Sequence, residues 1–130
     1  MDIVILGGDF DNLDNYSKDT ELPEYKLSET RIASFIKSLE FLGAPIYFVP
    51  GNHDPAGMFF ENNLQESTAD NSFNLTEISF NCHKKVYNIG KNLWILGLGG
   101  CCPAIKFDRK NETNESVWVG FPYETDQDSK

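Results

Sequence analysis

Two short polar segments carry residue types that suit metal-assisted chemistry, and each of them directly follows an apolar run. Gly-Gly-Asp at residues 7–9 follows the run at 3–6, and Gly-Asn-His-Asp at residues 51–54 follows the run at 45–50. Carboxylate and amide oxygens are ligands for hard divalent cations. A histidine can exchange a proton near neutral pH. The pattern predicts a metal site with catalytic chemistry at the carboxyl edge of a sheet.

Each candidate side chain suits a distinct task. The two oxygens of Asp9 could bridge two divalent cations, which at a separation of about 3.5–4 Å can activate water and neutralise a phosphoryl group. Asn52 offers a neutral oxygen ligand, and His53 could act as a general acid on a leaving group. Asp54 could accept a hydrogen bond from the His53 ring and fix its tautomer. The alternative is a pair of ordinary turns, because Gly, Asn and Asp all favour turns.

A β-strand, a helix and a second β-strand must position these segments. The apolar runs predict strands at residues 2–6 and 45–49. Between them, a 3–4 residue spacing predicts a helix whose N-cap is Ser28 and whose stop is Gly43. The predicted buried face comprises Ile32, Phe35, Ile36, Leu39 and Leu42. This order predicts a parallel, right-handed βαβ unit, which brings both polar segments to one sheet edge.

The rest of the chain gives weaker signals. We expect an acidic loop at 9–27, an irregular segment at 55–76, and a hairpin whose strands, 85–89 and 93–98, flank a turn at 90–92. Trp94, Leu96 and Leu98 should share one strand face. His83, just before the hairpin, is expected to be exposed. Residues 104–116 read as a charged, solvated segment, 117–122 as an apolar patch and 124–130 as a polar tail.

Composition excludes several classes of protein. The formal net charge of −9 over 130 residues argues against a nucleic-acid binder, which needs lysine and arginine to neutralise phosphates. No apolar run approaches the roughly 18–20 residues of a membrane span. The three cysteines, two of them adjacent, make a poor disulfide framework and predict a reducing, cytoplasmic location. Composition leaves the oligomeric state open.

At these polar segments the chain resembles the calcineurin-like metallophosphoesterase family. Residues 8–12 (Gly-Asp-Phe-Asp-Asn) are similar to its Gly-Asp-x-x-Asp/Asn block, and residues 51–54 match its Gly-Asn-His-Asp/Glu block. Residues 96–100 resemble a glycine-rich strand end in one branch of the family. The resemblance implies an α/β fold, a metallophosphoesterase-like β-sandwich flanked by helices and incomplete at both ends. We expect this partial domain to cover residues 1–123, with a polar tail at 124–130.

The resemblance also implies a function, the metal-dependent hydrolysis of a phosphate ester with two divalent metal ions, Mn, Fe, Zn or Mg. By it, Asp9 would bridge the two ions and Asn52 would bind one of them. His53 would contact the substrate and protonate the leaving alcohol, and Asp54 would orient His53. Monoesters, diesters, proteins, nucleotides and lipid head groups all stay open as substrates.

Two family blocks have no counterpart here. The family carries an Asp-x-His block before the Gly-Asp block and a Gly-His-x-His block after the tetrad, whereas His53 and His83 are the two histidines of this chain. We therefore expect activity to require sequence beyond this chain. One alternative is a catalytically inactive phosphoesterase-like scaffold or protein-binding module. Another is a nuclease of the same fold, which the net acidity disfavours.

Overall fold

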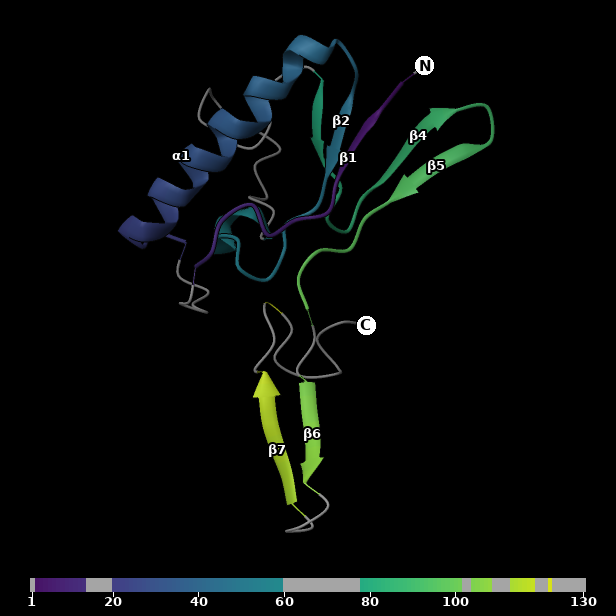
Figure 1. Ribbon diagram of the computed structural model, residues 1–130. Helices are drawn as coiled ribbons and strands as arrows, with labels where there is room; N and C mark the ends of the chain where they lie inside the picture. The colour runs from purple at the N-terminus through teal and green to yellow at the C-terminus, as the bar shows by residue number, and fades with distance from the viewer. Residues whose placement is uncertain are drawn as a thin grey trace.

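Over the residues that the structure describes, the protein has a mixed α/β architecture with parallel and antiparallel sheets and one α-helix (Figure 1). The computed structural model describes residues 2–13, 20–59, 78–101 and 122, together with the backbone of 104–108 and 113–118. The central sheet is parallel and has the order β1 (Val4–Leu6), β2 (Ile46–Phe48), β3 (Ser79–Asn81). All three residues of β2 are buried, as expected of a strand with a neighbour on each side.

The predicted parallel pairing of the first two strands is confirmed. Val4 is opposite Ile46, and Leu6 is opposite Phe48. The third strand, β3, was not predicted, because three residues between polar neighbours give little periodic signal. It extends the same parallel sheet, with Phe48 opposite Asn81.

The helix α1 (Pro23–Ser38) begins earlier than predicted. Ser28, expected as the N-cap, lies inside the helix with its side chain buried. The helix begins instead at Pro23, whose fixed φ suits a first turn and whose missing N–H costs nothing there. The predicted end is confirmed: a 3₁₀ turn, η1 (Leu39–Leu42), closes on Gly43, which has a φ of 63°.

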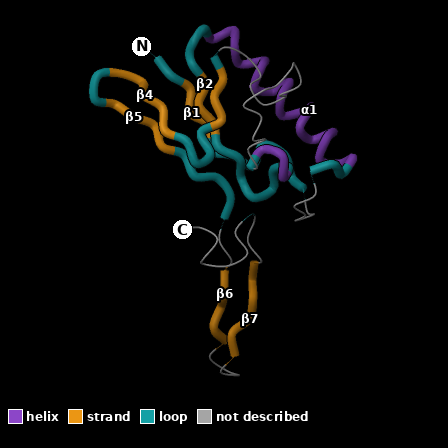
Figure 2. The backbone as a smooth tube through the Cα atoms, turned by 180° about the vertical axis from the view of Figure 1, so that it is seen from behind, coloured by secondary structure: helices purple, strands orange, loops and turns teal. Residues whose placement is uncertain are grey.

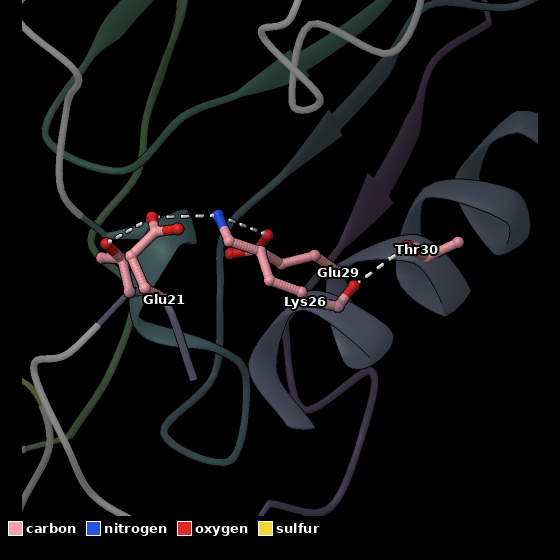
Figure 3. A network of polar contacts seen from close by, with 5 residues as sticks. Glu21, Lys26, Glu29 and Thr30 are labelled. Atoms are coloured by element: carbon pink, nitrogen blue, oxygen red, sulfur yellow. Dashed lines mark hydrogen bonds and ion pairs between the residues drawn. The ribbon is translucent and has the colours of Figure 1, made fainter. Parts of the chain in front are cut away.

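Polar contacts connect the first turns of α1 to each other and to the segment before the helix (Figure 3). Lys26 Nζ lies 3.4 Å from Glu21 Oε1 and 3.6 Å from Glu29 Oε2. Thr30 Oγ1 donates a 2.9 Å hydrogen bond to the Lys26 carbonyl oxygen. Burial raises the pKa of the Glu29 carboxyl, against the opposing effect of the Lys26 ammonium. The contacts connect the segment before the helix to its buried side.

The helix covers one face of the parallel sheet, and the hairpin of β4 (Val86–Gly90) and β5 (Leu93–Leu96) lies on the other side (Figures 1 and 2). The helix-side core contains Ile32, Ile36, Ile46, Phe48 and Met58. On the hairpin side, the Tyr47 ring stacks on Phe80 with centroids 5.2 Å apart, and Tyr87 of β4 packs against both. The predicted helix face is therefore correct at Ile32 and Ile36, whereas Phe35 and Leu42 are exposed.

The antiparallel hairpin of β4 and β5 confirms the prediction for this segment. Its turn uses Asn92 with a φ of 65°, a left-handed conformation that asparagine tolerates. Trp94 and Leu96, two residues apart in β5, lie on the same side of the strand and are exposed, as is Leu98 just beyond it. This outer face is apolar, although it faces away from the core.

A second hairpin replaces the solvated segment that we expected at 104–116. Its strands, β6 (Ala104–Asp108) and β7 (Thr113–Trp118), pair antiparallel, and it stands apart from the other elements in both views (Figures 1 and 2). Charged residues occupy strand positions here, with Lys106 in register with Glu115. Charge alone was therefore a poor indicator of a loop.

Other expectations fall partly outside the described residues. A 3₁₀ turn, η2 (Ala56–Met58), forms at the start of the segment predicted to be irregular, and 60–77 and the tail 124–130 lie outside the description. The domain boundary near residue 123 stays a prediction, as does the sandwich. Within the described ranges, no helix has the length and apolar character needed to cross a membrane.

Candidate metal centre

The two polar segments predicted from the sequence meet at the carboxyl edge of the parallel sheet. Because β1 and β2 are parallel and in register, the residues after Leu6 and after Phe48 leave the sheet side by side. The Val49 N–H donates to the Leu6 carbonyl at 3.2 Å, so the pairing continues to the start of both loops. We call residues 7–13 the first loop and residues 50–54 the tetrad loop.

Glycines allow the two loops to touch through their backbones. Gly8 has a φ of 90°, and a Cβ placed on it would lie 2.7 Å from the Gly51 Cα. A Cβ on Gly51 would in turn overlap the Asp9 carboxylate. Both positions therefore require glycine, for conformation at Gly8 and for space at Gly51.

Asp9 lies across the tetrad loop. Its own φ is 54°, an uncommon value for a residue with a side chain. Its Oδ1 accepts a 3.2 Å hydrogen bond from the backbone N–H of His53. Neither the Asp9 Oδ2 atom nor the Asn52 side-chain amide makes a hydrogen bond to another described residue, and the Asp9 side chain is exposed. A charged carboxylate oxygen of Asp9 and a neutral amide oxygen of Asn52 are thus available at one junction.

Asp54 connects the two loops through hydrogen bonds to the backbone of each. The side chain is 2 % exposed, its Oδ1 accepts from the Asp11 N–H at 3.0 Å, and its Oδ2 accepts from the Gly51 N–H at 2.8 Å. Burial raises the pKa of the Asp54 carboxyl, the nearby Asp9 carboxylate acts in the same direction, and the backbone N–H donors oppose them. Asp54 therefore fixes the separation of the loops through their backbones.

The ring of His53 is oriented by a backbone carbonyl. Its Nδ1 lies 3.2 Å from the Leu13 carbonyl oxygen, and the Leu13 N–H donates back to the His53 carbonyl at 3.1 Å. A carbonyl can only accept, so Nδ1 carries the proton of the neutral ring and Nε2 carries the lone pair. We had expected Asp54 to orient this ring. In the structure the Leu13 carbonyl is the partner of Nδ1, because both Asp54 oxygens accept hydrogen bonds from backbone N–H groups.

Sequence reasoning missed Asp11 and Arg31 as part of the site. Arg31 Nη2 on α1 forms a 3.3 Å ion pair with Asp11 Oδ2. The Ser28 hydroxyl beside Asp11 lowers the pKa of its carboxyl, and the Arg31 guanidinium adds to this. The ion pair is thus one contact between the first loop and α1. An acidic residue beside the Gly-Asp pair was the available signal.

His83 differs from the exposed residue that we expected. It is 5 % exposed, and the edge of the Phe59 ring packs against it with centroids 5.2 Å apart. The Gly99 N–H donates a 3.0 Å hydrogen bond to its Nδ1. Since Nδ1 accepts there, the proton of the neutral ring lies on Nε2. A ring in this state cannot coordinate a metal through Nε2.

The glycine-rich segment at 96–100 also reaches the carboxyl edge of the sheet. The Gly100 N–H donates to the Pro50 carbonyl at 2.9 Å, and a Cβ on Gly99 would lie 2.8 Å from Pro50 Cδ. This segment therefore supports the entry to the tetrad loop.

The donors at the loop junction fit part of the coordination shell of a hard divalent cation. Asp9 supplies a charged oxygen and Asn52 a neutral one, which is the chemistry that Mg²⁺ and Mn²⁺ accept. Over the ranges that the structure describes, no group of three or more His, Cys, Asp or Glu side chains is arranged to hold a metal ion. Asp9 and Asn52 would thus provide two ligands, and other donors would complete the shell.

Comparison with known proteins supports the same interpretation. A family model described as calcineurin-like phosphoesterase matches residues 1–120 of the 130-residue chain. Searches of curated proteins and of solved structures found no significant match. The matched range contains both loops, the glycine-rich segment and both hairpins. The chain belongs to the calcineurin-like phosphoesterase family.

Proposed function

We propose that this protein contributes the central part of a metal-dependent phosphoesterase site, which hydrolyses a phosphate ester. The observation that carries the proposal is the junction of the two loops. There Asp9 Oδ1 contacts the backbone of His53, while Asp9 Oδ2 and the Asn52 amide make no hydrogen bond to the described residues. A carboxylate, an amide and an imidazole thus share one sheet edge.

The residues have separate roles in this proposal. Asp9 and Asn52 would hold divalent cations. When bound, these would supply a Lewis acid that activates water and neutralises the phosphoryl charge. His53 holds its proton on Nδ1 against Leu13, so a second proton taken up at Nε2 is the one it can give to the leaving oxygen. Asp54 keeps the two loops at their separation.

The net charge of the chain makes the proposed activity depend on bound cations. With a formal net charge of −9 and no metal, the chain repels a phosphate, so cations must provide the local positive charge. This dependence makes metal removal a decisive perturbation. It also explains how an acidic protein could act on an anionic ester.

The test is hydrolysis of p-nitrophenyl phosphate and of bis(p-nitrophenyl) phosphate by the complete protein that contains this chain and supplies the remaining metal ligands, measured with Mn²⁺, Mg²⁺, Zn²⁺ and Fe²⁺ and after chelation. We expect turnover that depends on the cation and that Asp9→Asn abolishes. Asp2→Asn is the matched control, since it removes the same charge from an exposed residue. Metal binding without turnover on either ester would favour the inactive scaffold instead.

A further inference from the structure

The first loop connects α1 to the ring of His53 through a short series of contacts. Arg31 on α1 pairs with Asp11, and Leu13, two residues further along, contacts His53 with both its carbonyl oxygen and its N–H. We propose that Arg31 and Asp11 are positioning residues for His53, acting by holding the Leu13 carbonyl against Nδ1. The inference rests on the proposed function, in which His53 is the general acid.

The helix end of this connection is fixed by packing. Ile32, next to Arg31, is 1 % exposed and belongs to the core between α1 and the sheet. The backbone of α1 is therefore held firmly where Arg31 leaves it. The guanidinium restrains the first loop relative to the helix through its 3.3 Å contact with Asp11 Oδ2.

The loop end of the connection is fixed twice. The Asp11 side chain pairs with Arg31, and the Asp11 N–H donates to Asp54 Oδ1 at 3.0 Å. Asp11 Oδ1 also accepts from the Asn12 N–H at 2.9 Å. With Asp11 held on both sides, the conformational freedom of the two residues up to Leu13 is restricted.

The Leu13 carbonyl has a chemical effect that a mere packing contact would lack. A histidine ring in water favours the tautomer with its proton on Nε2. A carbonyl oxygen at Nδ1 favours the opposite tautomer, because only N–H can donate to it. A shift of the first loop would therefore change the ring tautomer of His53 before it changed the fold.

Because the ion pair is partly exposed, its effect on the His53 ring can be distinguished from an effect on the stability of the fold. The Arg31 side chain is 59 % exposed and that of Asp11 is 22 % exposed, and ion pairs that water reaches on one side stabilise proteins little. Losing the pair should thus leave the fold intact. A measurable effect on the His53 ring would then report positioning.

The experiment is a long-range ¹H–¹⁵N correlation spectrum of the two histidine rings at about pH 8, above the usual histidine pKa of about 6.5. In the unaltered chain we expect His53 in the Nδ1–H form and His83 in the Nε2–H form. Arg31→Gln should shift His53 toward Nε2–H, and Arg31→Lys should largely restore it. His83 should not change, which shows that the fold is retained. Lys37→Gln, on the same helix, is the control.

A kinetic arm links the tautomer to the chemistry. Arg31→Gln should lower kcat on an ester with a poor leaving group by about threefold to tenfold, a small part of the ~10²–10⁴-fold that general acids supply, and leave KM unchanged. An unchanged His53 tautomer in Arg31→Gln would overturn the positioning role and leave the proposed function intact. The expected tautomer shift, together with a complete protein that hydrolyses no ester, would contradict the function while supporting the positioning role.

Discussion

The two histidines of the chain occupy opposite chemical states within one small fold. His53 is partly exposed and donates from Nδ1 to the Leu13 carbonyl, whereas His83 is buried and accepts at Nδ1 from the Gly99 N–H. Each follows a strand of the same parallel sheet. The difference shows that the backbone group beside Nδ1, rather than the residue type, decides which nitrogen can do chemistry.

This comparison agrees with the general-acid role proposed for His53 and with a structural role for His83. His53 belongs to the loop junction, because its backbone N–H donates to Asp9 Oδ1 and Asn52 directly precedes it in the chain. The ring of His83 lies between Phe59 and the glycine-rich segment, where its hydrogen bond satisfies a buried backbone N–H. Substitutions at the two sites should therefore affect different properties.

The largest expected effect is that of His53→Ala on turnover. Loss of the general acid should lower kcat by about 10²–10⁴-fold with a poor alkyl leaving group, and much less with p-nitrophenol, which departs without protonation. Rates across a series of leaving groups would measure this. Equal losses of kcat with good and poor leaving groups would show that His53 is not the general acid.

Asp54→Asn should give the next largest effect, on stability. The new amide would place an N–H₂ group against backbone donors that now face a carboxylate oxygen, at Gly51 or Asp11. Leaving a buried donor unsatisfied costs about 1–3 kcal/mol, and more where the lost partner was charged. Urea unfolding would measure the loss. A variant as stable as the unaltered chain would show that Asp54 does not hold the loops together.

His83→Ala should lower stability by a similar or smaller amount and leave the chemistry alone. It would leave the buried Gly99 N–H without its acceptor, at a cost of about 1–3 kcal/mol. Urea unfolding and the kcat of the surviving folded protein would test this. A large drop in kcat in fully folded protein would contradict the comparison and show that His83 contributes to the site.

The smallest expected effect is a dependence of stability on pH at Asp11. Because the folded-state pKa of Asp11 is lowered from 3.8, its contribution is present above that value and is lost as the pH falls through the lower folded-state pKa. The stability difference between the unaltered chain and Asp11→Asn should thus shrink from about pH 5 to about pH 3. A difference independent of pH over that range would show that Ser28, the Asn12 N–H and Arg31 together make no net contribution through the Asp11 carboxylate.

The positions of the two loops were predictable, and the partners of the histidine rings were not. Parallel strands must end at one edge, so two apolar runs separated by a helix were enough to bring Asp9 and His53 together. The ring partners are backbone groups far along the chain, 40 residues away for His53 and 16 for His83. A backbone carbonyl or N–H has no signature in the sequence.

Local signals explain the other differences. The start of α1 was misplaced because Ser28 looks like a cap, whereas Pro23 begins the helix without any side-chain cap. The strands β6 and β7 were missed because charged residues at 104–116 suggested a solvated loop. Hydrophobic periodicity is a weak guide where a hairpin stands apart from the core.

The measurement that tests the central claim most directly is a Mn²⁺ titration of the chain followed by electron paramagnetic resonance, which reports the free ion. The account predicts saturable binding that Asp9→Asn weakens at least tenfold, while Asp2→Asn, with the same change in charge, leaves it unaltered. Equal Mn²⁺ binding by all three proteins would contradict the account. It would mean that the junction of the two loops is not a metal centre.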